Sequence, residues 1–149
     1  MSGGARGVDG AALAGALDKG GKVVVVLGCG VDVVYPPEHR RLLRRCKEQG
    51  ALVSELLPGT SPRRSFFVTR NRILAALADA TVLLWGEARS GALTTMRWGI
   101  RLGRPCAALE QAGGEVSEAS RMVQRQGAWV LAGVESLEKW LGNLRPLGV

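Results

Sequence analysis

The sequence predicts an α/β protein with a three-layer, Rossmann-like fold and a mostly parallel sheet. Short runs of β-branched residues, such as Val-Val-Val-Val-Leu at residues 23–27, alternate with longer stretches in which apolar residues recur at helical spacing. Continuous apolar runs of this kind suit strands that are buried on both faces, and crossover helices join such strands in parallel. Gly28 and Gly30 follow the first run and indicate a turn at the carboxyl end of that strand.

Each run and each helical stretch gives one expected element. The apolar runs predict strands at residues 23–27, 51–54, 81–85, 106–109 and 129–131. The helical spacing predicts helices near residues 9–19, 37–49, 67–79, 91–103, 117–127 and 134–142. Pro37 suits a first helical turn, while Gly50 and Gly103 suit helix ends. A glycine turn at residues 2–7 normally follows a strand, so the pattern lacks the first strand of this fold.

The composition favours one cytoplasmic domain without a metal or cofactor. A chain of 149 residues with 46% hydrophobic content can bury one ordinary core, so we expect a single domain over residues 1–149. No apolar run reaches the roughly 20 residues that cross a bilayer, and the N-terminus does not resemble a signal peptide. The three cysteines form no CxxC pair, and the single histidine, His39, is interpreted as a surface residue. The turn at residues 28–30 lacks the third glycine of a dinucleotide fingerprint, and the sequence contains no Walker motif.

The charge is basic and concentrated in one part of the sequence. The net charge is +7 and Arg outnumbers Lys by sixteen to four, which favours anionic partners because the planar arginine fork matches phosphate. Residues 40–72 contain nine arginines or lysines and two glutamates. The net charge of this stretch, +7, therefore equals that of the whole chain. Residues 40–47 taken alone could equally form a solvated helix face.

Four segments are expected at the carboxyl edge of the sheet, where glycine turns and helix N-termini can approach phosphate groups. The first, residues 2–9, combines Gly3 and Gly7 for close backbone approach with the charge of Arg6 and a helix cap at Asp9. The second is the glycine turn that follows the first apolar run. Neither segment is specific when taken alone.

The third and fourth segments each open a predicted helix. In the third, residues 58–74, Arg70 shares a helix face with the apolar residues that follow it. We expect its guanidinium to point into the crevice, and the alternative is a stem packed on the sheet with its head in water. In the fourth, Ser90 and Gly91 form either a second anion-receptive N-terminus or an ordinary helix cap.

Taken in order, six motifs become distinctive. They are SGGARGVD at 2–9, LGCGVDVVYPPEH at 27–39, LVSE at 52–55, PGTSP at 58–62, RNRIL at 70–74 and SGALTT at 90–95. This order resembles the Rossmann-like domain of the DprA/Smf family of DNA-processing proteins. The resemblance covers residues 2–109, and residues 110–149 are expected to complete the same domain without the family's winged-helix domain.

The resemblance implies a protein that binds single-stranded DNA in a basic pocket, forms a homodimer and passes the strand to the RecA recombinase in natural transformation. It implies no catalysed reaction. The matching positions imply a phosphate-binding loop of Ser2, Gly3, Arg6 and Gly7. They also imply a basic wall of the pocket, formed by Arg70, Asn71 and Arg72, and a neighbouring helix start at Ser90 and Gly91. Arg63 and Arg64 would lie on the path by which DNA enters the pocket.

The sequence departs from the family pattern in places. Leu13 stands where the family usually has histidine, Val68 and Thr69 stand near a usual Phe-Pro, and Trp85 stands near a usual glutamate. These departures predict a pocket that is altered in detail.

Two alternatives stay open at this point. The first is a nucleotide-binding or phosphoribohydrolase-like enzyme of a related Rossmann-like fold, with Glu55 or Glu87 as its carboxylate. The second is a shortened accessory paralogue. For DNA binding, Tyr35, Phe66 and Phe67 are the candidate surfaces on which bases stack, although the two phenylalanines also suit a core position.

Overall fold

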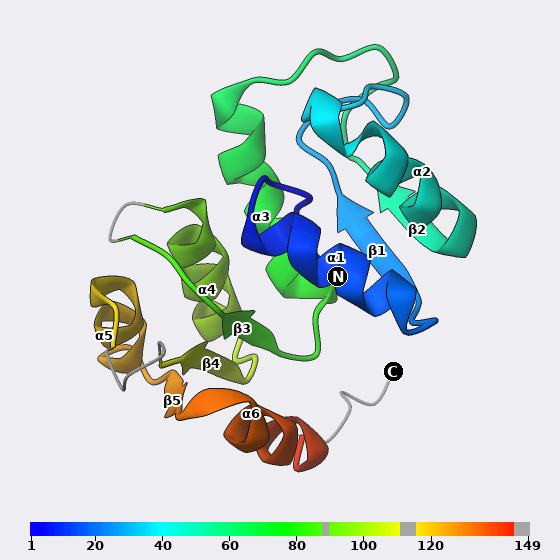
Figure 1. The fold of residues 1–149 in the computed structure, drawn as a ribbon. Coiled ribbons are helices and arrows are strands. Elements are labelled where there is room, and N and C mark those ends of the chain that lie inside the picture. The colour runs from blue at the N-terminus through cyan, green and yellow to red at the C-terminus, as the bar shows by residue number, and fades with distance from the viewer. Residues whose placement is uncertain (88–89, 111–115, 145–149) are drawn as a thin grey trace. The chain divides into compact units, whose positions relative to one another are not determined.

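The computed structural model describes residues 1–87, 90–110 and 116–144. The chain divides into two compact units, residues 1–74 and residues 75–149, which we describe one at a time. Figure 1 labels the elements along the chain. The first unit contains α1 (Val8–Asp18), β1 (Val23–Val26), η1 (Pro37–His39), α2 (Arg40–Gln49) and β2 (Gly50–Val53), and α3 (Arg64–Leu77) begins in it.

The core of the first unit lies between its sheet and two helices. β1 and β2 are parallel, in a register that pairs Val23 with Gly50 and Val26 with Val53. Alternate residues of a strand share one face, and on β1 this face packs against leucines of α1 and α2. The buried cluster consists of Leu13, Leu17, Val23, Val25, Leu27, Cys29, Leu43 and Cys46.

Ser2 adds one further contact to the edge of this sheet. Its N–H donates to the Val24 carbonyl oxygen over 3.0 Å, and the Val26 N–H donates to the Ser2 carbonyl oxygen over 3.1 Å. The two bonds form a parallel bridge between Ser2 and Val25. Because the bridge is parallel, the chain that follows Ser2 continues past the carboxyl end of β1.

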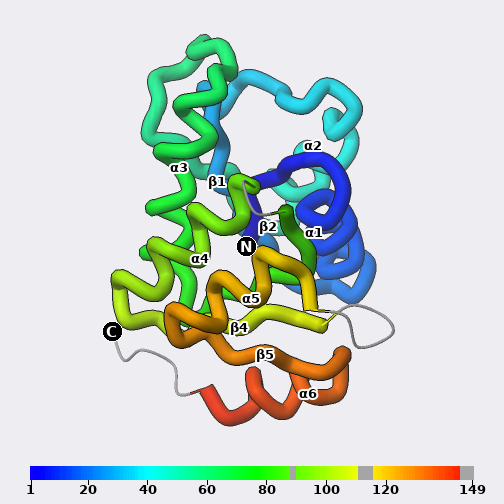
Figure 2. The backbone as a smooth tube through the Cα atoms, turned by 90° about the vertical axis from the view of Figure 1, so that its left-hand side faces the viewer, coloured from blue at the N-terminus to red at the C-terminus, as the bar shows by residue number. Residues whose placement is uncertain are grey.

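The second unit is built on a parallel sheet in the order β3-β4-β5. Its strands are β3 (Thr81–Leu83), β4 (Cys106–Leu109) and β5 (Trp129–Leu131), and its helices are α4 (Gly91–Arg101), α5 (Glu118–Gln124) and α6 (Gly133–Gly142). Figure 2 shows α5 and α6 beside β5. The buried cluster joins β3 and β4 to α4 and α5 through Leu83, Leu93, Met96, Cys106, Ala108, Ala119, Val123 and Ala128.

The structure confirms the predicted α/β class with parallel strands, and each of the five expected strands is present. The expected helix at 37–49 is divided into the short 3-10 helix η1 and the helix α2. Gly50 does not end α2 in a left-handed conformation, because it is extended (φ −170°) and pairs with Val23 as the first residue of β2. Gly103 has the expected left-handed conformation, with φ +67°. In the part of the chain that is described, no helix is long and apolar enough to cross a membrane.

Substitution of Leu43 tests the core of the first unit. Leu43 is 3% exposed in the cluster between α2 and β1, whereas Leu57 is 80% exposed. We expect Leu43→Ala to lower the free energy of unfolding by about 2–5 kcal/mol, because the substitution removes buried apolar surface and leaves a cavity. Leu57→Ala, the matched control, should change it by less than about 0.5 kcal/mol. Urea denaturation followed by circular dichroism measures both, and equal effects would contradict this packing.

Candidate functional site

A glycine-rich loop, Ser2–Gly7, lies beyond the carboxyl end of β1 and leads directly into α1. Gly4 and Gly7 have φ values of +69° and +77°, which favour glycine because a side chain would be strained there. The Ala11 N–H donates to the carbonyl oxygen of Gly7, the N-cap residue of α1, over 3.0 Å. The N–H groups of residues 8–10 therefore lie in the first turn of the helix, before this hydrogen bond. Such N–H groups carry the partial positive charge of a helix N-terminus. The loop therefore has the features of an anion-binding turn.

Arg70 reaches this loop from α3 and is buried, with 5% of its surface exposed. Its Nη1 donates to the Gly3 carbonyl oxygen over 2.7 Å and also to the Val26 carbonyl oxygen. A Cβ atom on Gly3 would lie 2.6 Å from the same nitrogen, so the close approach requires glycine. Arg70 thus ties the loop to the end of β1. The sequence predicts either a guanidinium that points into an open crevice or one that lies in water. The Arg70 guanidinium does neither, because it is buried against backbone carbonyl oxygens.

The surroundings of Arg70 explain how a charged group is held there. Its guanidinium carbon lies 5.7 Å from the centre of the Phe67 ring, which itself lies 5.2 Å from the Tyr35 ring. Burial lowers the pKa of the Arg70 guanidinium from its usual value, and the charge of Asp9 opposes this shift. Arginine nevertheless stays protonated because its intrinsic pKa is so high. The buried cation is therefore stabilised by carbonyl oxygens and an aromatic face.

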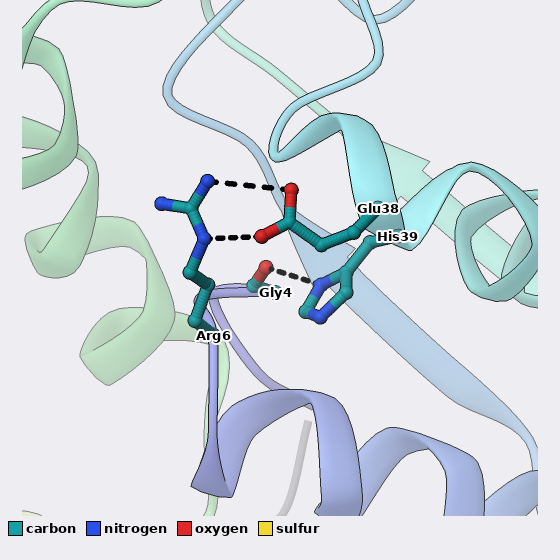
Figure 3. Close-up of polar contacts among 4 residues, drawn as sticks. All are labelled: Gly4, Arg6, Glu38 and His39. Carbon is teal, nitrogen blue, oxygen red and sulfur yellow. Dashed lines mark hydrogen bonds and ion pairs between the residues drawn. The ribbon is translucent and has the colours of Figure 1, made fainter.

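Arg6 projects from the same loop and is exposed. Its Nε and Nη2 donate to the carboxylate of Glu38, with Nη2 3.3 Å from Oε2 (Figure 3). The guanidinium also lies 5.9 Å from the centre of the Tyr35 ring. The Glu38 carboxylate therefore contacts the edge of the guanidinium that Nε and Nη2 form. An exposed ion pair of this kind is weak, because water screens both charges.

His39 holds the loop from the other side. Its Nδ1 lies 3.1 Å from the Gly4 carbonyl oxygen, an acceptor, so Nδ1 carries the proton (Figure 3). The ring also packs on the start of α1, where a Cβ atom on Gly10 would lie 2.8 Å from Cε1. His39 is therefore half-buried and has a structural contact in addition to its expected position at the surface. Sequence reasoning also missed Glu38, although both residues follow the prolines at the same sheet edge.

The two loops after β1 and β2 are bonded to each other. The Gly59 N–H donates to both carboxylate oxygens of Asp32, over 2.8 and 3.0 Å. The Gly30 N–H donates to the Thr60 carbonyl oxygen over 2.8 Å, and the Ser54 hydroxyl donates to the Cys29 carbonyl oxygen over 2.7 Å. The Asp32 carboxylate and the turn at residues 28–30 therefore maintain the shape of this edge.

The other residues of the expected binding site differ in burial and in their contacts. Arg72 lies two residues after Arg70, a rotation of about 200° around a helix, and its guanidinium pairs with Glu55. Arg63 and Arg64 are exposed, and in the described residues no carboxylate pairs with either. Asn71 is buried, with 6% of its surface exposed. The structure thus brings Arg70 to the Ser2–Gly7 loop, while Arg72 faces elsewhere.

Ser90 and Gly91 lie in the second unit, at the start of α4. Ser90 occupies the N-cap position with φ −76° and ψ 154°, but its side chain makes no capping hydrogen bond. Its N–H donates to the Glu87 carbonyl oxygen over 3.0 Å, and its buried hydroxyl has no partner among the residues that the structure describes. Within that part of the chain, no group of three or more His, Cys, Asp or Glu side chains could hold a metal ion.

Replacing Arg70 tests its bridging contacts. We expect Arg70→Lys to lower the free energy of unfolding by about 1.5–3 kcal/mol, because the shorter and more strongly hydrated ammonium would not occupy the position of Nη1, which donates both hydrogen bonds. Arg72→Lys, at the exposed pair with Glu55, should change it by less than about 1 kcal/mol. Denaturation measures both values. Hydrogen exchange should also show faster exchange at Gly3 and Gly4 in Arg70→Lys alone, and unchanged exchange there would contradict the bridge.

The ion pair of Arg6 with Glu38 has a pH signature. A hydrogen bond and charge from Arg6 lower the pKa of the Glu38 carboxyl below its usual value. A lowered pKa means that the pair is fully formed above the usual glutamate pKa and is lost as the pH falls through the lowered one. We expect Arg6→Gln to raise the Glu38 pKa toward its usual value in an NMR titration of the carboxyl carbon. Arg63→Gln should leave it unchanged, and equal responses would rule out a specific pair.

Comparison with known proteins identifies the family. The sequence model of the family described as DNA recombination-mediator protein A matches residues 1–142. A protein described as putative DNA processing protein DprA from Mycobacterium tuberculosis (strain H37Rv) is 41% identical over 150 residues, which cover 99% of this chain and 38% of that protein. The chain therefore spans less than half the length of this relative.

Two solved structures share the fold. DNA processing protein A from Streptococcus pneumoniae has a TM-score of 0.82 and 32% identity, covering 97% of this chain and 50% of that chain. DNA processing protein A from Helicobacter pylori has a TM-score of 0.83 and 24% identity, covering 97% of this chain and 66% of that chain. These similarities confirm the Rossmann-like class, and with the family match over residues 1–142 they show that the chain belongs to the DprA/Smf family of DNA-processing proteins.

Proposed function

We propose that this chain binds single-stranded DNA through the phosphate groups of the strand. The observation that carries the proposal is the Ser2–Gly7 loop, which Arg70 and His39 fix at the carboxyl end of β1 immediately before the N-terminus of α1. A rigid turn with a helix N-terminus and an exposed arginine is suited to phosphate, since N–H groups and cation can act on one anion. The relative from Helicobacter pylori is described as having a single-stranded DNA binding mode, which supports the proposal.

The arrangement of cations favours contacts to the DNA backbone. Arg6 is exposed beside Glu38 and Tyr35, and Arg63 and Arg64 add exposed charge at the start of α3. Phe67 packs against Tyr35 and under Arg70, so its ring is part of the structure and is not a free surface for bases. We therefore expect binding that depends little on base sequence.

The wider role follows from the family and forms part of the proposal. As a DprA-family protein the chain would act in the cytoplasm during natural transformation, bind as a homodimer and pass single-stranded DNA to RecA. Ser90 and Gly91 would add a second phosphate contact at α4. These partners and contacts belong to the whole family protein, of which this chain spans a part.

The alternative of a nucleotide hydrolase has no specific observation in its favour. Glu55 is paired with Arg72. Release of a free base from nucleoside monophosphates, abolished by Glu87→Gln, would establish that activity. We propose binding without a catalysed reaction.

Fluorescence anisotropy with a labelled thymidine oligonucleotide tests the proposal. The logarithm of affinity should fall linearly with the logarithm of salt concentration, by about 0.7 per phosphate contacted. Arg6→Gln should weaken binding roughly tenfold and reduce the salt slope, because it removes one phosphate contact. Arg125→Gln, an exposed arginine of the second unit, is the charge-matched control. No binding at low salt, or equal loss in both variants, would refute the proposed site.

A further inference from the structure

We propose that α2 carries a second set of contacts to the same single strand. The contacts come from a row of exposed cations that we call the α2 basic face, which consists of Arg40, Arg41, Arg44 and Lys47. The inference rests on the proposed function, since it extends the path of the DNA beyond the Ser2–Gly7 loop.

The cations of α2 are more numerous than the fold requires. Leu43 and Cys46 face the core and are 3% and 0% exposed, so the arginines lie on the outer side. Arg45 has a structural partner, because its Nη2 lies 2.7 Å from Asp18 Oδ1 at the end of α1. Arg44 has a loose contact, with its Nε 3.8 Å from Glu48 Oε1 and both side chains largely exposed.

The rest of the α2 basic face has no carboxylate partner among the described residues. Arg40, Arg41 and Lys47 form no ion pair there. Arg40, Arg44 and Lys47 are spaced at i, i+4 and i+7, so they form a stripe along one side of the helix that is about 10 Å long at 1.5 Å per residue. A stripe of this length can contact more than one phosphate of a strand.

The position of the first two arginines is unfavourable for the helix itself. Arg40 and Arg41 occupy the first turn of α2, which contains no acidic residue. The N-terminus of a helix carries partial positive charge, so cations there are destabilising and carboxylates are the favoured residues. Residues that contradict such a helix preference, and that have no contact to compensate for it, are typical of functional positions. A bound phosphate group would supply the missing negative charge.

The α2 basic face is continuous with the site in the chain and in space. α2 follows η1 directly, and η1 supplies Glu38 to Arg6 and His39 to Gly4. Figure 3 shows both side chains extending from this turn toward the Ser2–Gly7 loop. Arg40 and Arg41 therefore begin where the loop contacts end, and Arg44 and Lys47 continue along α2.

The test compares short and long DNA on a triple variant, Arg40→Gln/Arg44→Gln/Lys47→Gln. Its charge-matched control is Arg121→Gln/Arg125→Gln/Lys139→Gln, three exposed cations of the second unit. We expect binding of a four-nucleotide thymidine oligomer to stay within about twofold, because it reaches only the loop. Binding of a 20-nucleotide oligomer should weaken at least about tenfold, and its salt slope should fall by about 2, since three contacts of about 0.7 each are removed.

The outcomes separate this inference from the proposed function. If the α2 variant and the control weaken long DNA equally, or if the α2 variant leaves it unchanged while Arg6→Gln weakens it, the inference fails and the loop site stands. If the unaltered protein binds neither oligomer at low salt, both proposals fail. The α2 variant should melt close to the unaltered protein. Removing Arg40 from the first turn favours the helix dipole, whereas removing Lys47 from the last turn and the Arg44 contact with Glu48 opposes it weakly. A large fall in melting temperature would indicate a structural role instead.

Discussion

The buried guanidinium of Arg70 joins three segments that are far apart in the sequence. It comes from α3, donates to the Gly3 carbonyl oxygen in the N-terminal loop and donates to the Val26 carbonyl oxygen at the end of β1. Removing a cation from water is unfavourable unless hydrogen bonds and nearby electron-rich groups replace the water. Here the carbonyl oxygens and the Phe67 ring do so, and the position of the loop depends on them.

This arrangement separates the buried Arg70, which holds the loop, from the exposed arginines that our proposal assigns to the ligand. Arg70 is buried, and its Nη1 donates to two backbone carbonyl oxygens, so it holds the loop in place. Arg6 and Arg72 are exposed and paired with Glu38 and Glu55. Because exposed pairs are weak, a phosphate group can replace a carboxylate there at small cost. In the free protein, Glu38 thus holds the Arg6 side chain, which our proposal assigns to the anion.

α2 shows the same division between cations with a structural contact and exposed cations. α2 uses Leu43 and Cys46 to pack in the core and Arg45 to contact Asp18 of α1, whereas Arg40, Arg44 and Lys47 are exposed along another side of the helix. They supply three of the nine cations that make residues 40–72 as basic as the whole chain.

The sequence by itself determined the strands, their parallel order and the family. Apolar runs such as residues 23–27 and turns marked by glycine are local signals, so periodicity was sufficient to place them. Tertiary structure decided which polar groups meet. Local sequence does not indicate that Arg70 donates to the Gly3 carbonyl oxygen, that His39 contacts Gly4 or that Glu38 pairs with Arg6. Each of these contacts joins residues more than 30 positions apart. Such contacts depend on the chain path around the sheet edge, and that path exists only once β1, α2 and α3 have packed.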